Sequence, residues 1–236
     1  MQERLATNKP YDQTARKLIS AEGETAFNGP VNFLVTHRDE PAVKVSRIFL
    51  GVRMDCARCH DHPFARWTQD DYARFEQFFE SMKLRETSNS NIELFESPRN
   101  RNDDRPRFLT GATPQTTRWR DELALFITTC RPFARNYANR MWYQLLGRGI
   151  VNPPDDFSAN EPVAPELLEY LADYARETDF RPKDMIRAIC LSQAYQRESG
   201  HSDSLDQAAL FGSFTPKPLT FSQKVRVHFF FEMGVL

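Results

Sequence analysis

Residues 41–82 have the sequence PAVKVSRIFLGVRMDCARCHDHPFARWTQDDYARFEQFFESM, in which two apolar helical patterns flank a segment with two cysteines and two histidines. Pro41 suits the first position of a helix, and the apolar residues that follow recur at the spacing of one helical face: Val45, Ile48, Phe49 and Val52. A second pattern starts after Thr68, which with Asp71 resembles a capping box, and its apolar face comprises Phe75, Phe78, Phe79 and Met82. The stretch therefore predicts two helices joined by a loop that carries the cysteines.

The second half of the chain also has helical periodicity. Apolar residues recur at helical spacing in four stretches between residues 119 and 198, and Pro132, Gly147 and Pro182 mark helix boundaries there. Residues 85–118 are rich in Ser, Asn, Arg, Asp and Pro and have no sustained period, which predicts a linker. The predicted fold class is mainly α. A short helical piece carries the loop with the C-x-x-C-H pattern of residues 56–60, and a small helical bundle follows it.

Composition excludes several classes of protein. The 236 residues include 31 Lys plus Arg and 32 Asp plus Glu, so the formal net charge is −1. This balance argues against a nucleic-acid binder and against a polybasic membrane anchor. No apolar run approaches the roughly 20 residues of a membrane-spanning helix, and the mean hydropathy is −0.60. Four cysteines are too few for a disulfide scaffold in a chain of this length.

The pentapeptide Cys56-Ala57-Arg58-Cys59-His60 is the pattern at which haem c is attached to proteins. In that chemistry the two thiols add to the vinyl groups of the porphyrin, and the adjacent imidazole binds the iron from one side. We therefore predict a haem c site formed by Cys56, Cys59 and His60, with His60 as an iron ligand. The expected role is electron transfer, or redox support of a larger assembly, with a redox partner that the sequence does not identify.

Three other interpretations of the same residues stay open. Cys56, Cys59, His60 and His62 form a possible zinc set, although paired zinc-binding histidines are usually further apart. A zinc site or a bare cysteine loop would make the chain a non-redox interaction module. A redox C-x-x-C usually follows a strand, and none is predicted before Cys56. The third alternative is a purely structural cysteine pair.

Other polar and sulfur-containing residues favour structural roles. Cys130 and Cys190 lie on apolar helical faces, which predicts core packing. Asp155 and Asp156 lie in a proline-rich loop, where such pairs are typical of turns and caps, and no nucleophile or base accompanies them at a diagnostic spacing. The sequence thus favours a protein that is not an enzyme. Possible second axial ligands to a haem iron are four residues elsewhere in the chain: His37, Met82, Met141 and His201.

Two groups of motifs resemble planctomycete cytochrome-c-like proteins. The first group resembles the end of domain of unknown function 1549: Leu50-Gly51-Val52, Cys56 to Phe64, Trp67, Asp71 and Phe78-Phe79. The second resembles domain of unknown function 1553: Phe133-Ala134-Arg135, Asn139 to Trp142, Gly147 to Val151, Pro154 to Phe157, Pro165 to Leu168, Ile186-Arg187 and Tyr195-Gln196. The resemblance implies a large exported protein and no particular reaction. One departure is Val163-Ala164, where the family pattern has Ser-His.

The resemblance also implies a domain organisation. We expect residues 1–84 to be the C-terminal part of the first domain, 85–118 a linker, 119–198 the N-terminal part of the second domain, and 199–236 an atypical, truncated tail. No signal peptide is visible in the first 40 residues, and we expect the true ends of the protein to lie outside this sequence. Because bacteria attach haem c outside the cytoplasmic membrane, the haem prediction implies a periplasmic or exported protein that is part of a larger polypeptide or complex.

Overall fold

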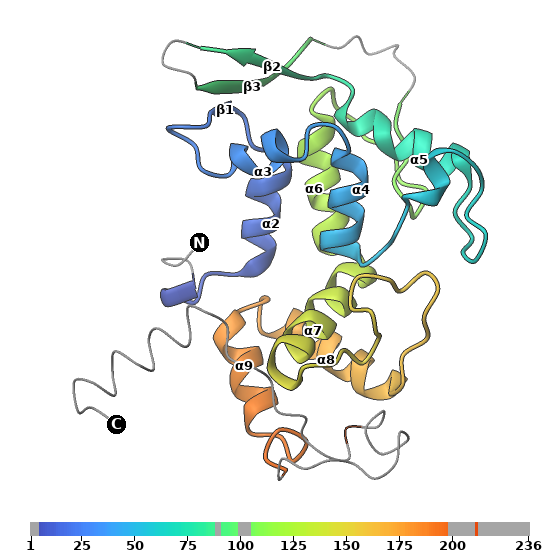
Figure 1. The fold of residues 1–236 in the computed structure, drawn as a ribbon. Helices are drawn as coiled ribbons and strands as arrows, with labels where there is room; N and C mark the ends of the chain where they lie inside the picture. Colours follow the sequence, from blue (N-terminus) through green and yellow to red (C-terminus); the bar gives the residue numbers. More distant parts are fainter. Residues whose placement is uncertain (1–4, 88–90, 99–104, 198–210, 212–236) are drawn as a thin grey trace, which may run out of the picture.

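The computed structural model describes residues 5–87, 91–98, 105–197 and 211 (Figure 1). These residues confirm the prediction of a mainly α-helical chain. The N-terminal helices are α2 (Tyr11–Ile19), α3 (Val31–Thr36), α4 (Pro41–Val45) and α5 (Gln69–Glu76). The C-terminal helices are α6 (Trp119–Thr129), α7 (Arg131–Leu146), α8 (Pro165–Glu177) and α9 (Pro182–Cys190).

The helix that starts at Pro41 has two parts. α4 continues directly into a π-helical turn, Ser46–Leu50, and the turn ends at Gly51, which has a φ of 66°. A side chain is disfavoured at this position for two reasons, the positive φ and a lack of space, because a Cβ on Gly51 would lie 2.5 Å from Cδ2 of Phe157. The predicted helix therefore stops before Val52, and the chain turns toward the cysteines.

The second predicted helix begins as expected and ends early. The Thr68 side chain accepts a hydrogen bond from the backbone N–H of Asp71, and Asp71 accepts one from the backbone of Thr68, so the capping box is confirmed. α5 ends at Glu76 and tightens into a 3-10 turn, Gln77–Phe79. Met82 was predicted on the same helical face, but it is the first residue of a strand.

A small sheet was not anticipated from the sequence. β1 (Gly23–Glu24), β2 (Met82–Glu86) and β3 (Ile92–Glu96) form an antiparallel sheet in the order β1-β3-β2. Leu94 in the central strand pairs with both Gly23 and Leu84 and is fully buried. The end of β2 and all of β3 lie in the stretch 85–118, where short strands whose few apolar residues face one side leave only a weak sequence pattern.

The buried side chains form two hydrophobic clusters that meet on α7. The first cluster packs α2 to α6 with the sheet, and the second packs α7, α8 and α9. Phe133 belongs to the first and Tyr137, one helical turn later, to the second. The Tyr11 ring stacks on both of these rings, with centroids 5.7 and 5.1 Å apart. The predicted C-terminal bundle therefore contributes α6 and the start of α7 to the N-terminal core.

Within the described ranges, no helix combines the length and the apolar character that crossing a membrane would require.

Candidate functional site

The C-x-x-C-H residues form a turn on the surface of the molecule. Cys56–Arg58 is a 3-10 turn, and the backbone N–H groups of Cys59 and His60 donate to the carbonyl of Cys56 at 3.2 and 3.3 Å. Ala57 is fully buried, whereas Cys56, Cys59 and His60 are exposed. Both thiols are free. The buried Ala57 side chain thus fixes a turn that presents two thiols and an imidazole to solvent.

The imidazole of His60 is oriented by the backbone of the next residue. Its Nδ1 lies 2.7 Å from the carbonyl oxygen of Asp61. Because a carbonyl only accepts hydrogen bonds, this contact requires the proton on Nδ1 and leaves the lone pair of a neutral ring on Nε2. Metal-binding histidines commonly have this arrangement, in which one ring nitrogen donates to a carbonyl and the other faces the metal. The donor set of two exposed thiols and this imidazole therefore fits a covalently held haem.

His62 has a different environment. Its backbone N–H donates to the carbonyl of Trp67 at 2.8 Å, and its Nδ1 accepts a hydrogen bond from the backbone of Phe64 at 3.2 Å. These contacts close the loop that follows the cysteine turn. In the part of the chain that the structure describes, no three residues of the His, Cys, Asp and Glu types are grouped so that they could hold a metal ion. His62 thus shapes the loop, and the zinc set stays an untested alternative.

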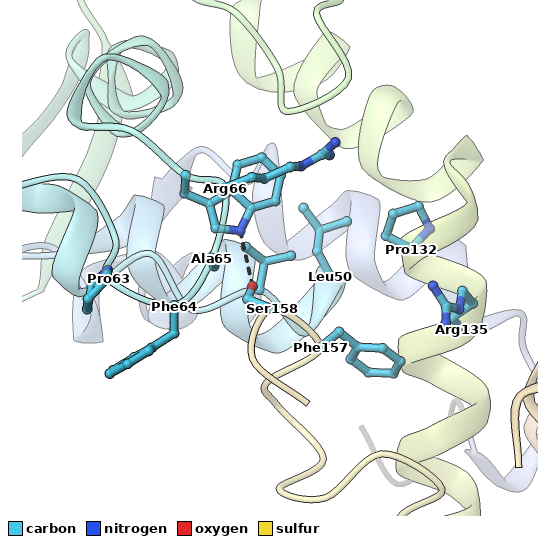
Figure 2. Close-up of a pocket in the computed structure, with 11 residues that line it drawn as sticks. Leu50, Pro63, Phe64, Ala65, Arg66, Pro132, Arg135, Phe157 and Ser158 are labelled. Atoms are coloured by element: carbon cyan, nitrogen blue, oxygen red, sulfur yellow. Dashed lines mark hydrogen bonds between the residues drawn. The ribbon is translucent and has the colours of Figure 1, made fainter. Parts of the chain in front are cut away.

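A pocket of about 610 Å³ lies beside the cysteine turn (Figure 2). Its volume is within the range of roughly 300–1,000 Å³ that is typical of small-molecule and cofactor sites. Apolar side chains dominate the wall, with two arginines, and the lining residues are Leu50, Val52, Pro63, Phe64, Ala65, Arg66, Trp67, Pro132, Arg135, Phe157 and Ser158. The Phe64 ring points away from the labelled wall residues in Figure 2, and the residue is 82% exposed.

The loop after α7 closes one side of this pocket. The backbone N–H of Phe157 donates to the carbonyl of Gly51 at 2.8 Å, and the indole N–H of Trp67 donates to the Ser158 hydroxyl at 3.1 Å (Figure 2). The carboxylate of Asp155 forms ion pairs with Arg47 and, at 3.2 Å, with Arg53. The segments on either side of the cysteine turn and the loop around residue 157, about a hundred residues apart in the sequence, thus line one pocket.

Two family models match the chain. The model described as Protein of unknown function (DUF1549), named PSCyt2, matches residues 1–84, and the model described as Protein of unknown function (DUF1553), named PSD1, matches residues 120–229. Residues 1–84 thus resemble the first family, and residues 120–229 resemble the second, adjoining one. Their names are those of planctomycete cytochrome-c-associated families, so the resemblance inferred from the sequence is confirmed. No curated protein and no solved structure matches the chain.

The DUF1549 part, residues 1–84, and the DUF1553 part, residues 120–229, share the pocket. Leu50, Val52 and residues 63–67 line it from the DUF1549 part, and Pro132, Arg135, Phe157 and Ser158 line it from the DUF1553 part. Polar contacts from α7 reinforce this junction: the Asn136 amide donates to the carbonyl of Ile48 at 2.7 Å, and Arg140 donates to that of Arg47 at 3.1 Å.

Asp155 holds the two family parts together electrostatically. Burial alone would raise the pKa of its carboxyl, but the hydrogen bond from Arg47 and the positive charges of Arg47 and Arg53 lower that pKa below its usual value. Ionised Asp155 therefore stabilises the folded chain above the pKa of an unfolded aspartate, about 3.9, and this contribution is lost as the pH falls further.

We expect Asp155→Asn to lower the free energy of unfolding by about 1–2 kcal/mol at neutral pH, because two arginines lose their charged partner. The difference from the parent protein should shrink below about pH 4, where Asp155 becomes protonated first in the unfolded chain and, at still lower pH, in the folded chain. Urea unfolding of both proteins at pH 7 and at low pH measures this. A difference that is the same at both pH values would contradict the assignment of charge to Asp155.

Asp156 and Asn139 have structural roles in the DUF1553 part. Asp156 Oδ1 accepts hydrogen bonds from the backbones of Ser158 and Ala159, which is the turn role expected from the sequence. Asn139 is fully buried, and its amide exchanges two hydrogen bonds with the backbone of Val151, at 2.9 and 3.0 Å. These two hydrogen bonds anchor the loop that follows α7 to the helix.

The other two cysteines are less accessible than the cysteines of the turn. Cys130 caps the end of α6 and Cys190 is the last residue of α9, and both are partly buried. Burial raises the pKa of the Cys130 thiol to about 11. This environment agrees with the expected packing role, and it keeps Cys130 protonated at neutral pH.

We expect iodoacetamide to modify Cys56 and Cys59 of the haem-free protein first. Cys130 should react on the order of a hundredfold more slowly, because burial leaves little thiolate there. Peptide mass mapping after short exposures at pH 7.5 gives the order of reaction, and the same reagent in urea serves as the control that equalises access. Equal rates at Cys59 and Cys130 in the native protein would show that the turn is not presented as described.

The residues considered as second axial ligands lie elsewhere. Met82 begins β2 and packs partly against the first cluster, His37 follows α3 with its ring edge-on to Phe33, and Met141 lines a separate cavity of about 310 Å³. His201 lies outside the described residues, as does the phenylalanine-rich tail. No histidine or methionine of the described chain lines the pocket beside the cysteine turn.

Sequence reasoning found the thiols and the imidazole of the site but missed most of the pocket wall. Arg66 lies within the quoted stretch 41–82 but in none of the motifs, and its position on the wall carries no sequence signal of its own. Arg135 and Phe157 reach the pocket only because α7 and the following loop fold back on Gly51. Arg135 and Phe157 both belong to the DUF1553 motifs quoted above, but those motifs assign neither residue a function.

Proposed function

We propose that this chain is a c-type haem-binding protein that transfers electrons, or supports redox chemistry, within an exported assembly. The observation that carries the proposal is the turn of Cys56, Cys59 and His60. It combines two exposed, free thiols with an imidazole whose Nδ1 is engaged by the carbonyl of Asp61. The names of the matching families agree with this function and leave the cofactor untested.

Each residue of the turn would have a defined role. Cys56 and Cys59 would hold the haem through thioether bonds, in which each S–H adds across one vinyl group. His60 would present Nε2 to the iron, and the Asp61 carbonyl would keep the ring oriented. Bound haem supplies one-electron transfer at its iron, with a potential that depends on the axial ligands and on burial. The buried Ala57 would prevent the turn from shifting when the haem is attached.

Covalent attachment of haem would also determine the compartment in which the protein works. Haem c is attached outside the cytoplasmic membrane in bacteria, so we place the working protein in the periplasm or beyond. The partner would be a redox protein, and nothing in the composition favours nucleic acid, because the net charge is −1. Zinc held by Cys56, Cys59, His60 and His62 is the alternative, with an interaction module as the function.

Absorption spectroscopy separates haem from zinc. We would express the chain with a bacterial haem-maturation system and record the spectrum before and after extraction with acidified acetone. The proposal predicts a Soret band that stays with the protein after extraction and denaturation, because the thioether bonds are covalent. A colourless protein that contains one equivalent of zinc would overturn the proposal and favour the interaction module.

A further inference from the structure

The pocket is lined by the chain segments that come directly before and directly after the cysteine turn. Val52, four residues before Cys56, lines the pocket, and so does Pro63, four residues after Cys59. Four residues span at most about 14 Å, so the thiols cannot lie far from this wall. A group attached to Cys56 and Cys59 is therefore tethered within reach of the pocket.

The pocket presents both apolar side chains and positively charged groups to a ligand. Leu50, Val52, Trp67, Pro132 and Phe157 form its apolar surface. The charged side chains in its described lining are Arg66 and Arg135, and no acidic residue is among them. A cavity that combines apolar side chains with cationic ones, and has no acidic side chain among its described lining, favours an anionic ligand over a neutral or cationic one.

Arg66 is the arginine that is available for such a ligand. Its guanidinium lies 4.6 Å from the ring centroid of Trp67 and, within the described part of the chain, forms no ion pair. In Figure 2 it extends toward the side of the pocket where Pro132 and Arg135 lie. Arg135, by contrast, already pairs with Glu169 at 2.8 Å and faces the Phe157 ring at 5.5 Å.

We propose that this pocket binds the porphyrin ring of the haem and that Arg66 binds a propionate carboxylate of the same haem. This inference rests on the proposed function for its occupant, and it adds the binding surface and a specific anchoring residue. The thioether bonds of haem c lie on the edge of the ring opposite to the propionates. A ring attached at the turn would thus direct its carboxylates away from the turn and toward the arginines. A guanidinium is well suited to a carboxylate, because its planar donors can bind both oxygens.

The test separates binding in the pocket from covalent attachment. The double variant Cys56→Ser/Cys59→Ser cannot form thioether bonds, so hemin added to it reports non-covalent binding by the pocket alone. We expect one equivalent to bind with a shift of the Soret band. Arg66→Gln in this background should weaken binding about tenfold, because one charge-assisted hydrogen bond is lost. The matched control is Arg187→Gln on α9, which is exposed and outside the pocket lining, and it should leave binding unchanged.

Each outcome either supports or overturns the binding of haem in this pocket. Absence of saturable hemin binding, or equal affinity in the Arg66→Gln and Arg187→Gln variants, would overturn the inference. Arg66-dependent hemin binding by a chain that never acquires covalent haem would refute the proposed function while supporting the pocket.

A second readout uses the matured protein with its two cysteines intact. Loss of the Arg66 charge should lower the midpoint potential of the haem, because a nearby cation favours the reduced form. An unchanged potential in Arg66→Gln would overturn the contact between Arg66 and the propionate and leave the attachment standing. Far-UV circular dichroism confirms that each variant is folded.

Discussion

Replacing Arg120 with alanine is expected to lower the free energy of unfolding by about 3–5 kcal/mol. Arg120 lies near the start of α6 and is 1% exposed. Its guanidinium donates to Glu96 in β3 at 2.5 Å and to the backbone carbonyls of Ile19 and Ala21 at 3.2 and 2.9 Å. Removal of the side chain would leave a cavity and three acceptors without their donor.

Urea unfolding measures this loss, and Arg118→Ala is the matched control. Arg118 precedes α6, is largely exposed and pairs only with Asp121 among the described residues, so its replacement should cost less than about 1 kcal/mol. Because Arg120 lies in the DUF1553 match and Ile19 and Ala21 in the DUF1549 match, its loss should also loosen the junction of the two parts. Similar losses for both variants would contradict the role of Arg120 as a buried connection.

The double substitution Cys56→Ser/Cys59→Ser is expected to abolish covalent haem completely. Serine hydroxyls do not form the thioether bonds, and both positions are exposed, so the fold should keep its stability. Haem staining of a denaturing gel after expression with the maturation system measures the attached group. The matched control, Cys130→Ser/Cys190→Ser, changes the same number of thiols away from the turn and should keep its stain. Equal staining of the two double variants would refute attachment at the turn.

The helices were predictable because their signals are local. The capping box of Thr68 and Asp71, Gly147 at the end of α7 and Pro182 at the start of α9 each act within one helical turn. The sheet was missed because β1 has two residues and its pairing with β3 joins positions about 70 residues apart. Met82 was assigned to a helix for the same reason. Its strand, β2, exists only through pairing with β3, whereas the spacing of Met82 from Phe78 and Phe79 also fits a helical face.

The candidate site was only half predictable. The C-x-x-C-H motif, Cys56 to His60, can be recognised in a single sequence because its chemistry depends only on the spacing of neighbouring residues. The pocket is not visible in the sequence, because Gly51 and Phe157 become neighbours only when the chain folds and the backbone N–H of Phe157 donates to the carbonyl of Gly51. The positive φ of Gly51 and its contact with the Phe157 ring show why glycine is required there, a requirement that a single sequence does not reveal.

The central claim is that Cys56 and Cys59 carry a haem covalently. The most direct measurement is the intact mass, under denaturing conditions, of the full chain expressed with the haem-maturation system. We predict a gain of one haem over the mass of the polypeptide, located by fragmentation on the peptide that contains residues 56–60. A mass equal to that of the bare polypeptide, in material matured alongside a cytochrome c that does acquire haem, would contradict the account.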